Sequence, residues 1–201
     1  MIGATWYLFR GLVVRIPSQH PQLSGGGSVT KRLRIVLSAV LSLAFLLITA
    51  PAQAAALVTV IRYDASRAAE FSATIDQAAQ VWNANVSNVR LVRGTPAHFV
   101  VIADNGWPRA LPTSLGRGTV WMGRQAVDQG YYPLRIATHE IGHILGLPDR
   151  RTGLCSDLMS GSSAPVSCQN AAPSAAERAE VDRNFAGATP QVTFGTLHVD
   201  R

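Results

Sequence analysis

The stretch Thr138–Asp149, THEIGHILGLPD, combines histidines and acids at spacings that could hold and use a metal ion. His139 and His143 lie four positions apart, so on a helix their imidazoles share one face and can bind one ion. Glu140 would stand beside that ion without having to bind it, which is the position of a general base for a zinc-activated water. These residue types at this spacing therefore predict zinc-dependent hydrolysis.

Asp149 is the candidate for a third ligand. A catalytic zinc site has three protein ligands and leaves one position open for water. Gly146 follows the last apolar position of the helical pattern, where a glycine in the left-handed conformation commonly ends a helix. The chain could then turn back, and Leu147 and Pro148 would extend it to Asp149. Gly142 either allows a close approach beneath the metal or is a tolerated helix glycine, and the sequence leaves both open.

Chance is a weak explanation for this motif. In a chain of this composition, HExxH alone arises by chance in about one of four hundred sequences, and the later Gly and Asp reduce this to about one in a hundred thousand. A solvated helix with incidental histidines is therefore disfavoured. His98 and His198 fall outside the motif, and we expect both to be ordinary surface or sheet histidines.

The rest of the chain contains elements that could position the motif. Apolar residues at helical spacing predict three helices, at 68–86, 133–145 and 173–186. Runs rich in β-branched residues predict four strands, at 57–63, 89–93, 97–103 and 118–123. The Gly- and Pro-rich segment 104–118 predicts a loop, and 187–201 is expected to be irregular or weakly extended. This order indicates a small α/β layer fold with a mixed sheet.

The N-terminal part of the sequence predicts export. The uncharged run 35–50 follows a basic cluster and precedes an A-x-A site at 52–54, as in a secretory signal peptide. A membrane anchor is the alternative, but the run is shorter than the about 20 residues of a membrane span. We interpret 29–54 as the signal peptide and 1–28 as a gene-model extension or a leader.

This division leaves a predicted catalytic domain at 55–190, followed by a tail at 191–201. The formal net charge of +6 would suggest an anionic partner. Residues 1–54 hold five basic residues and no acid, so the remainder has 13 basic against 12 acidic residues. We therefore expect no nucleic-acid partner, no stable membrane association after signal cleavage, and a monomer.

Cys155 and Cys168 are the two cysteines of the sequence. An even pair in an exported chain favours a disulfide, which would stabilise the fold by about 3 kcal/mol in the chain-entropy model. Free thiols or zinc thiolates are the alternatives, but the spacing is not that of a C-x-x-C pair.

HEIGHILGLPD followed by CSDLMSG resembles the snapalysins, small secreted neutral zinc proteases of high-G+C bacteria, and the resemblance covers nearly all of 57–186. VTVIRYD and QAAQVWNANVSNVRL are similar to the family's first strand and first helix. The resemblance implies a metzincin-like (zincin) α+β fold, with a small twisted mixed sheet that has an edge substrate strand. An N-terminal helix, an active-site helix and a C-terminal helix would complete it, and the two cysteines match the family's disulfide.

By this resemblance, one catalytic Zn2+ would be held by three ligands, namely His139, His143 and Asp149. Glu140 would be the catalytic acid/base. Met159 would be the Met-turn residue, an apolar floor beneath the zinc site, although it would otherwise read as an ordinary core methionine. The implied activity is that of a secreted zinc metalloendopeptidase acting on proteins and peptides outside the cell.

The resemblance also implies features of substrate binding. Strand 118–123 would be the edge strand that binds the peptide, and cleavage on the amino side of aromatic residues implies an apolar S1′ pocket beside the Met-turn. Two positions depart from the family. Arg151 stands where the family often has an oxyanion-supporting Tyr, and it would either take that role or point to water. Tyr132 replaces the family's calcium-binding acid, so calcium is not expected there.

Two other functions remain open on the sequence alone. A zinc hydrolase could act on a non-protein amide, such as one in the cell wall. A secreted binding module could carry an inactive, structural zinc site. The presence of Glu140 disfavours the second alternative, because a structural site has no use for a base at that position.

Overall fold

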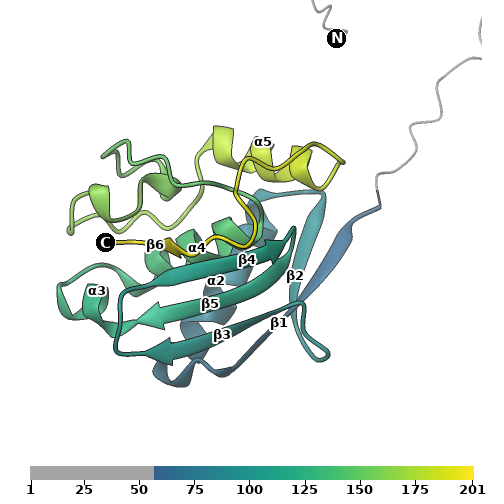
Figure 1. Ribbon diagram of the computed structural model, residues 1–201. Helices are drawn as coiled ribbons and strands as arrows, with labels where there is room; N and C mark the ends of the chain where they lie inside the picture. Colours follow the sequence, from purple (N-terminus) through teal and green to yellow (C-terminus); the bar gives the residue numbers. More distant parts are fainter. Residues whose placement is uncertain (1–56) are drawn as a thin grey trace, which may run out of the picture. The chain divides into compact units, whose positions relative to one another are not determined.

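The computed structural model describes residues 57–201 (Figure 1), so the predicted extension at 1–28 and the predicted signal peptide at 29–54 lie outside the described residues. The elements of the described part are β1 (Thr59–Arg67), η2 (Ala69–Phe71), α2 (Ser72–Asn85), β2 (Val89–Arg93), β3 (Phe99–Asp104), β4 (Arg109–Ser114), β5 (Arg117–Gly123), α3 (Arg124–Asp128), α4 (Pro133–Ile144), η3 (Leu158–Ser163), α5 (Ala175–Asn184) and β6 (His198–Val199). Over these residues, no helix combines the length and the apolarity that crossing a membrane requires.

The strands form one six-stranded sheet in the order β2-β1-β3-β5-β4-β6. The pairs β1–β2, β1–β3 and β3–β5 are parallel, whereas β4 runs antiparallel to β5 and β6 runs antiparallel to β4. Helices α2 and α4 lie together on one face of this sheet (Figure 1). The predicted mixed-sheet α/β fold is therefore confirmed, and so are the three predicted helices.

The two central helices are joined through a buried tryptophan. Helix α2 buries its apolar stripe, as its helical spacing predicts, and the stripe ends at the fully buried Trp82. The indole N–H of Trp82 donates to the carbonyl of Thr138 at 2.9 Å. Thr138 directly precedes the first histidine of the motif, so this bond fixes α4 relative to α2 at the level of the predicted metal site.

The segment 104–118 is not the loop that its composition predicts, because it contains strand β4. Strand 118–123 is also not the edge strand, because β5 is paired with β3 on one side and with β4 on the other. Pro112 explains why a strand is compatible with this composition. Its carbonyl accepts from Gly195 on the outer side of β4, and its missing N–H lies on that same side, beyond the residues of β4 that pair with β6. A proline is tolerated at such an edge position, where no neighbouring strand needs the N–H.

The tail 191–201 is extended along β4 and forms the short strand β6. Ala110 pairs with His198, and Arg109 pairs with Val199. Two further backbone bonds extend this contact on either side, since Gly195 donates to Pro112 at 2.8 Å and Asp200 donates to Pro108 at 3.0 Å. The expectation of an irregular or weakly extended tail is thus confirmed, but its location on the sheet edge was not predicted.

The region after α4 is held by the predicted disulfide and by a capped helix. Cys155 and Cys168 are bonded to each other, which confirms that prediction. Helix α5 begins after Ser174, whose side chain accepts from the Glu177 N–H, while the Glu177 carboxylate accepts from the Ser174 N–H. This reciprocal arrangement is a capping box.

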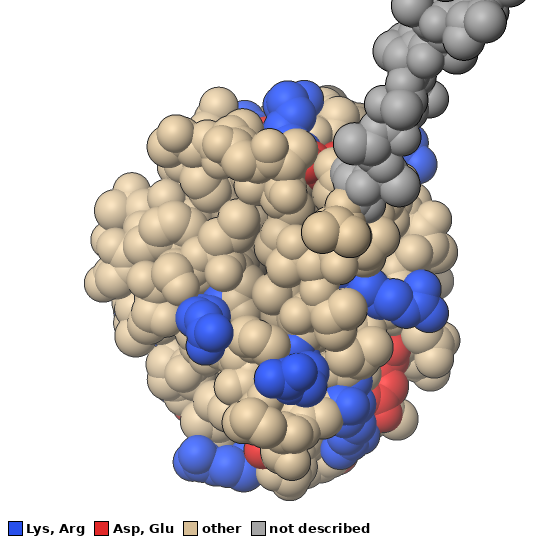
Figure 2. Space-filling view, turned by 90° about the vertical axis from the view of Figure 1, so that its right-hand side faces the viewer, with Lys and Arg blue, Asp and Glu red and all other residues tan. Residues whose placement is uncertain are grey.

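Basic side chains do not gather into one continuous patch on the face shown in Figure 2. There the blue groups are separated by uncharged residues, and acidic groups lie next to some of them. This distribution agrees with the nearly balanced charge of residues 55–201.

Candidate metal centre

Helix α4 presents its two histidines inside the protein. Pro133 stands at the first position of the helix, where its missing N–H costs no hydrogen bond. Ile141 and Ile144 are fully buried and anchor the helix in the core. The side chains of His139 and His143 are each only 1% exposed, so both rings lie inside the protein.

Backbone carbonyls set the orientation of both imidazoles. His139 Nδ1 lies 3.0 Å from the carbonyl oxygen of Leu158, and His143 Nδ1 lies 2.8 Å from that of Leu147. A carbonyl oxygen only accepts, so Nδ1 carries the proton on each ring and donates it. Nε2 of each ring is then left with a free lone pair, as a metal ligand requires.

Gly146 ends α4 in the way its position predicts. It has φ of +96°, its N–H donates to the carbonyl of His143, and the next N–H, of Leu147, donates to the carbonyl of Gly142. This pair of bonds is a Schellman motif, which reverses the chain direction after a helix. The reversal delivers Asp149 to the two histidines.

Asp149 Oδ1 lies 3.3 Å from His139 Nε2 and 3.7 Å from His143 Nε2. Two ligands at 2.0–2.1 Å in a tetrahedral zinc site would be about 3.3 Å apart. The three residues predicted as ligands therefore meet at a separation that suits one zinc ion.

Unpartnered polar atoms around this point show that the donor set fits a cation. Within residues 57–201, His139 Nε2, Asp149 Oδ1 and both carboxylate oxygens of Glu140 are buried without a hydrogen-bond partner. Leaving such atoms unpaired is costly, and buried charges are normally paired or bound to metal. Two imidazole nitrogens and a carboxylate oxygen are ligands that zinc accepts.

The electrostatics also favour a cation here. Burial lowers the pKa of His139, but the carboxylates of Asp200 and Asp149 outweigh it and raise that pKa to about 9. Burial together with His139 lowers the pKa of His143 to about 3. Burial raises the pKa of the Glu140 carboxyl well above its ordinary value. A positive charge at this point, either a proton on His139 Nε2 or a cation bound in its place, is thus stabilised by the surrounding carboxylates.

Met159 lies beneath α4, where Gly142 makes room for it. A Cβ added to Gly142 would come within 2.7 Å of the Met159 sulfur and within 3.4 Å of the Trp82 ring. The structure therefore resolves the question that the sequence left open: Gly142 permits close packing of a fully buried methionine under the motif. The Met-turn role of Met159, which the snapalysin resemblance implies, is consistent with this position.

Two charged residues that the sequence analysis missed hold the segment around Met159. The buried Glu177 carboxylate accepts from the N–H groups of Leu158 and Met159. The guanidinium of the buried Arg135 donates to four backbone carbonyls, those of Cys155, Asn170, Asp157 and Leu158. The S-x-x-E pattern at Ser174 could have marked Glu177 as a capping residue, but no sequence signal connects it to the turn.

Arg151 points neither to bulk water nor to an open oxyanion position. Its guanidinium donates to Asp200 Oδ1 at 2.7 Å and to Ser162 Oγ at 2.7 Å, and it lies 3.4 Å from Asp149 Oδ2. It therefore joins the third candidate ligand to the tail 191–201. Support of an oxyanion by Arg151 stays a prediction.

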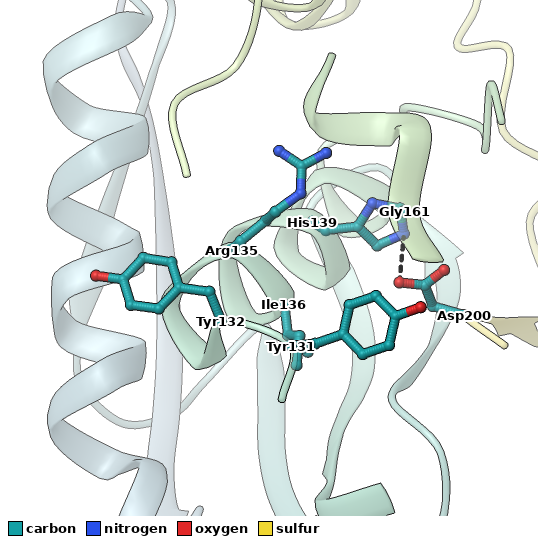
Figure 3. A pocket seen from close by; sticks show the side chains of 7 residues that line it. All are labelled: Tyr131, Tyr132, Arg135, Ile136, His139, Gly161 and Asp200. Atoms are coloured by element: carbon teal, nitrogen blue, oxygen red, sulfur yellow. Dashed lines mark ion pairs between the residues drawn. The ribbon is translucent and has the colours of Figure 1, made fainter. Parts of the chain in front are cut away.

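A pocket opens beside His139, between the start of α4 and the turn after Met159. It is lined by Tyr131, Tyr132, Arg135, Ile136, His139, Gly161 and Asp200. Figure 3 shows the Tyr131 ring directed toward Asp200 and the Arg135 guanidinium directed away from it. The Tyr131 ring therefore lies beside the His139–Asp200 ion pair, whereas the Tyr132 ring points the other way.

These features define the class: an HExxH motif that brings two histidines and an aspartate together as candidate metal ligands, carried on a mixed α/β sheet. The chain belongs to the Streptomyces extracellular neutral proteinase (M7) family, whose model matches residues 57–188. The resemblance to the snapalysins is therefore confirmed. The tail 191–201 lies beyond the matched residues.

Named relatives agree with this family assignment. The chain is 43% identical over 134 residues to an extracellular small neutral protease of Streptomyces coelicolor, which covers 65% of this chain and 61% of the relative. It is 41% identical to a protein of that name from Streptomyces sp. (strain C5), over 65% of this chain and 58% of the relative. It is also 41% identical to the protein of that name from Streptomyces caespitosus, over 63% of this chain and 96% of the relative. The chain thus spans less than two thirds of the first two relatives. Similarity to high choriolytic enzyme 1, a hatching-enzyme zinc protease of Oryzias latipes, is limited to 47% of each chain at 25% identity and a TM-score of 0.36, and carries no argument.

Proposed function

We propose that this protein is a zinc-dependent endopeptidase that hydrolyses protein and peptide substrates outside the cell. The observation that carries the proposal is the meeting of His139, His143 and Asp149 beside the unpartnered, buried carboxylate of Glu140. Three ligands and a separate base are what a hydrolytic zinc site needs, whereas a structural site would use a fourth protein ligand in place of the base. Family membership supports the same conclusion.

His139, His143 and Asp149 would hold the zinc ion. When bound, zinc supplies Lewis-acid polarisation and lowers the pKa of a water molecule. Glu140 accepts the proton of the attacking water and then gives it to the departing amine, so one carboxyl serves as base and acid in turn. Burial raises the pKa of the Glu140 carboxyl well above its ordinary value, which makes Glu140 a stronger base toward the water proton.

Substrate would bind along the outer edge of β4, where backbone groups can pair with an extended peptide. The pocket beside His139 would take the side chain that follows the cleaved bond. Its lining includes the aromatic ring of Tyr131 and the aliphatic side chain of Ile136, and these apolar surfaces support the predicted preference for cleavage on the amino side of aromatic residues.

Action outside the cell is supported by two observations. The relatives are named extracellular proteases. The Cys155–Cys168 disulfide is of a kind that persists in oxidising surroundings. The signal peptide at 29–54 would provide the export route, and we propose that the exported domain acts as a monomer.

The proposal is tested by casein hydrolysis with wild type and Glu140→Gln, both loaded with zinc. We expect wild type to clear casein, a chelator to abolish this and added zinc to restore it. Glu140→Gln should bind zinc but lose activity by at least about a hundredfold, since general acid–base catalysis contributes 10²–10⁴-fold. Equal activity of the two proteins, or an inactive wild type with zinc bound, would contradict the peptidase function.

A further inference from the structure

The outer edge of β4, where a peptide substrate would pair, is already covered by the protein's own tail. Backbone groups of Gly195, His198, Val199 and Asp200 contact this edge between Pro112 and Pro108. His198 and Val199 pair antiparallel with β4, as a peptide bound by β-augmentation would, whereas Gly195 contacts it from a turn. The binding edge is thus occupied by a segment of the same chain.

The tail ends with a carboxylate at the metal site. The Asp200 side chain is only 9% exposed, and its Oδ2 lies 4.0 Å from His139 Nε2, as the dashed line in Figure 3 marks. Asp200, His139 and Glu140 form a second group of three ligand atoms, all within 4.8 Å of one another. The Asp200 carboxylate therefore lies beside both His139 and the proposed base, Glu140.

Several contacts hold Asp200 in this place. Its Oδ1 accepts from Arg151 at 2.7 Å and from the N–H of Ser162 at 2.8 Å. Gly161 provides the space, because a Cβ there would come within 2.4 Å of the same oxygen. Arg151 also donates to the carbonyl of Val199. Arg151 therefore binds both the backbone and a side chain of the tail.

His198 adds a contact between the tail and His143, the second histidine of the motif. Its ring stacks on that of His143 with centroids 4.5 Å apart and an angle of 23° between the planes. Its Nε2 is buried and has no hydrogen-bond partner among the residues that the structure describes. The tail therefore covers both histidines of the motif, with His198 over one and Asp200 beside the other.

We infer that the tail 191–201 is an internal inhibitor, which covers the β4 edge and places the Asp200 carboxylate beside His139 and Glu140. The inference rests on the proposed peptidase function, because a substrate would need the same β4 edge and the attacking water would need the same space beside Glu140. Tail and substrate cannot occupy these places together, so cleavage requires the tail to leave.

The first test compares full-length, zinc-loaded wild type, Asp200→Asn and Asp128→Asn on a quenched peptide with an aromatic residue after the cleaved bond. Asp128→Asn is the matched control, since it removes an exposed carboxylate on α3. We expect kcat/KM to rise roughly tenfold or more in Asp200→Asn, the change that losing a charge-assisted hydrogen bond brings, and to stay unchanged in the control. A rate of Asp200→Asn equal to or below that of wild type would overturn the inference.

A second measurement does not depend on activity or on a variant. Amide hydrogen exchange over 195–200 in wild type should slow when zinc is added, and more than exchange over β2, which lies at the opposite edge of the sheet. Asp200→Asn should lose most of this difference. Equal exchange of 195–200 with and without zinc would overturn the inference.

The two measurements separate failure of the inference from failure of the proposed function. Zinc-dependent protection of 195–200 without any cleavage by wild type or Asp200→Asn would refute the peptidase function and still place the tail at the metal. A synthetic peptide of residues 191–201 should also inhibit Asp200→Asn competitively, and the same peptide with Asn in place of Asp should inhibit more weakly. No inhibition by either peptide would count against the tail as an inhibitor.

Discussion

Replacing Glu177 by Gln should destabilise the turn that carries Met159. The carboxylate is buried, with the residue 1% exposed, and accepts three backbone N–H groups. Oε1 accepts from Met159 at 2.7 Å, while Oε2 accepts from Leu158 at 3.1 Å and from Ser174 at 2.6 Å. One side chain thus caps α5 and fixes the turn beneath the candidate metal centre.

The size of the effect follows from the number of acceptor atoms. An amide has one oxygen, so if it keeps the two contacts of Oε2, the N–H of Met159 faces an NH2 group and loses its acceptor. A hydrogen bond to a charged group contributes about 1.5–3 kcal/mol, and the two remaining bonds weaken because their acceptor becomes neutral. We therefore expect the free energy of unfolding to fall by about 3 kcal/mol.

Urea unfolding of the zinc-loaded protein measures this change, with Ser174→Ala as the matched control. The control removes only the contact between Ser174 Oγ and the Glu177 N–H, at 3.4 Å, and should cost about 1 kcal/mol. Zinc should also dissociate about tenfold faster from Glu177→Gln, because the carbonyl of Leu158 orients His139. If Glu177→Gln were no less stable than Ser174→Ala, the assigned link between α5 and the turn would be refuted.

Two further changes test the ligand set and the turn after α4. Asp149→Ala should weaken zinc binding by at least about a hundredfold in a chelator competition. Loss of a group that only orients a ligand lowers metal affinity by about 10–100-fold, and loss of a ligand should lower it no less. Retention of zinc would show that Asp149 is not a ligand. Gly146→Ala should lower the free energy of unfolding by about 2 kcal/mol, because it forces a left-handed φ and brings a Cβ within 2.6 Å of Asn184 Nδ2. Gly187→Ala is the control, because Gly187 has a similar φ of +98° and nothing lies within 4 Å of the new Cβ. This variant should lose only the stability that the left-handed φ costs an alanine. Equal melting temperatures for the two variants would show that the contact with Asn184 adds nothing.

The convergence of the candidate metal ligands was predictable because these residues lie in one short stretch. His139, His143 and Asp149 are within eleven residues, and a helix followed by a glycine turn is enough to bring them together. The helices were predictable for a similar reason, since apolar spacing and caps are local signals.

Strand β4 and the tail were not predictable from such signals. The prolines and glycines of 104–118 predict a loop, and only the pairing of β4 with β5 reveals a strand in which Pro112 is harmless at the edge. Asp200 has no motif around it. Asp200 pairs with Arg151, which lies 49 residues away in the sequence, and neither local sequence predicts this contact.

The two histidines of the motif differ in the sequence distance to the carbonyl that orients each ring. His143 takes its orienting carbonyl from Leu147, four residues on and fixed by the same turn that ends α4. His139 takes its carbonyl from Leu158, which depends in turn on the buried Glu177. The sequence motif therefore specifies one ligand completely and the other only in part. Loss of Glu177 should accordingly disturb the ring of His139 while leaving that of His143 in place.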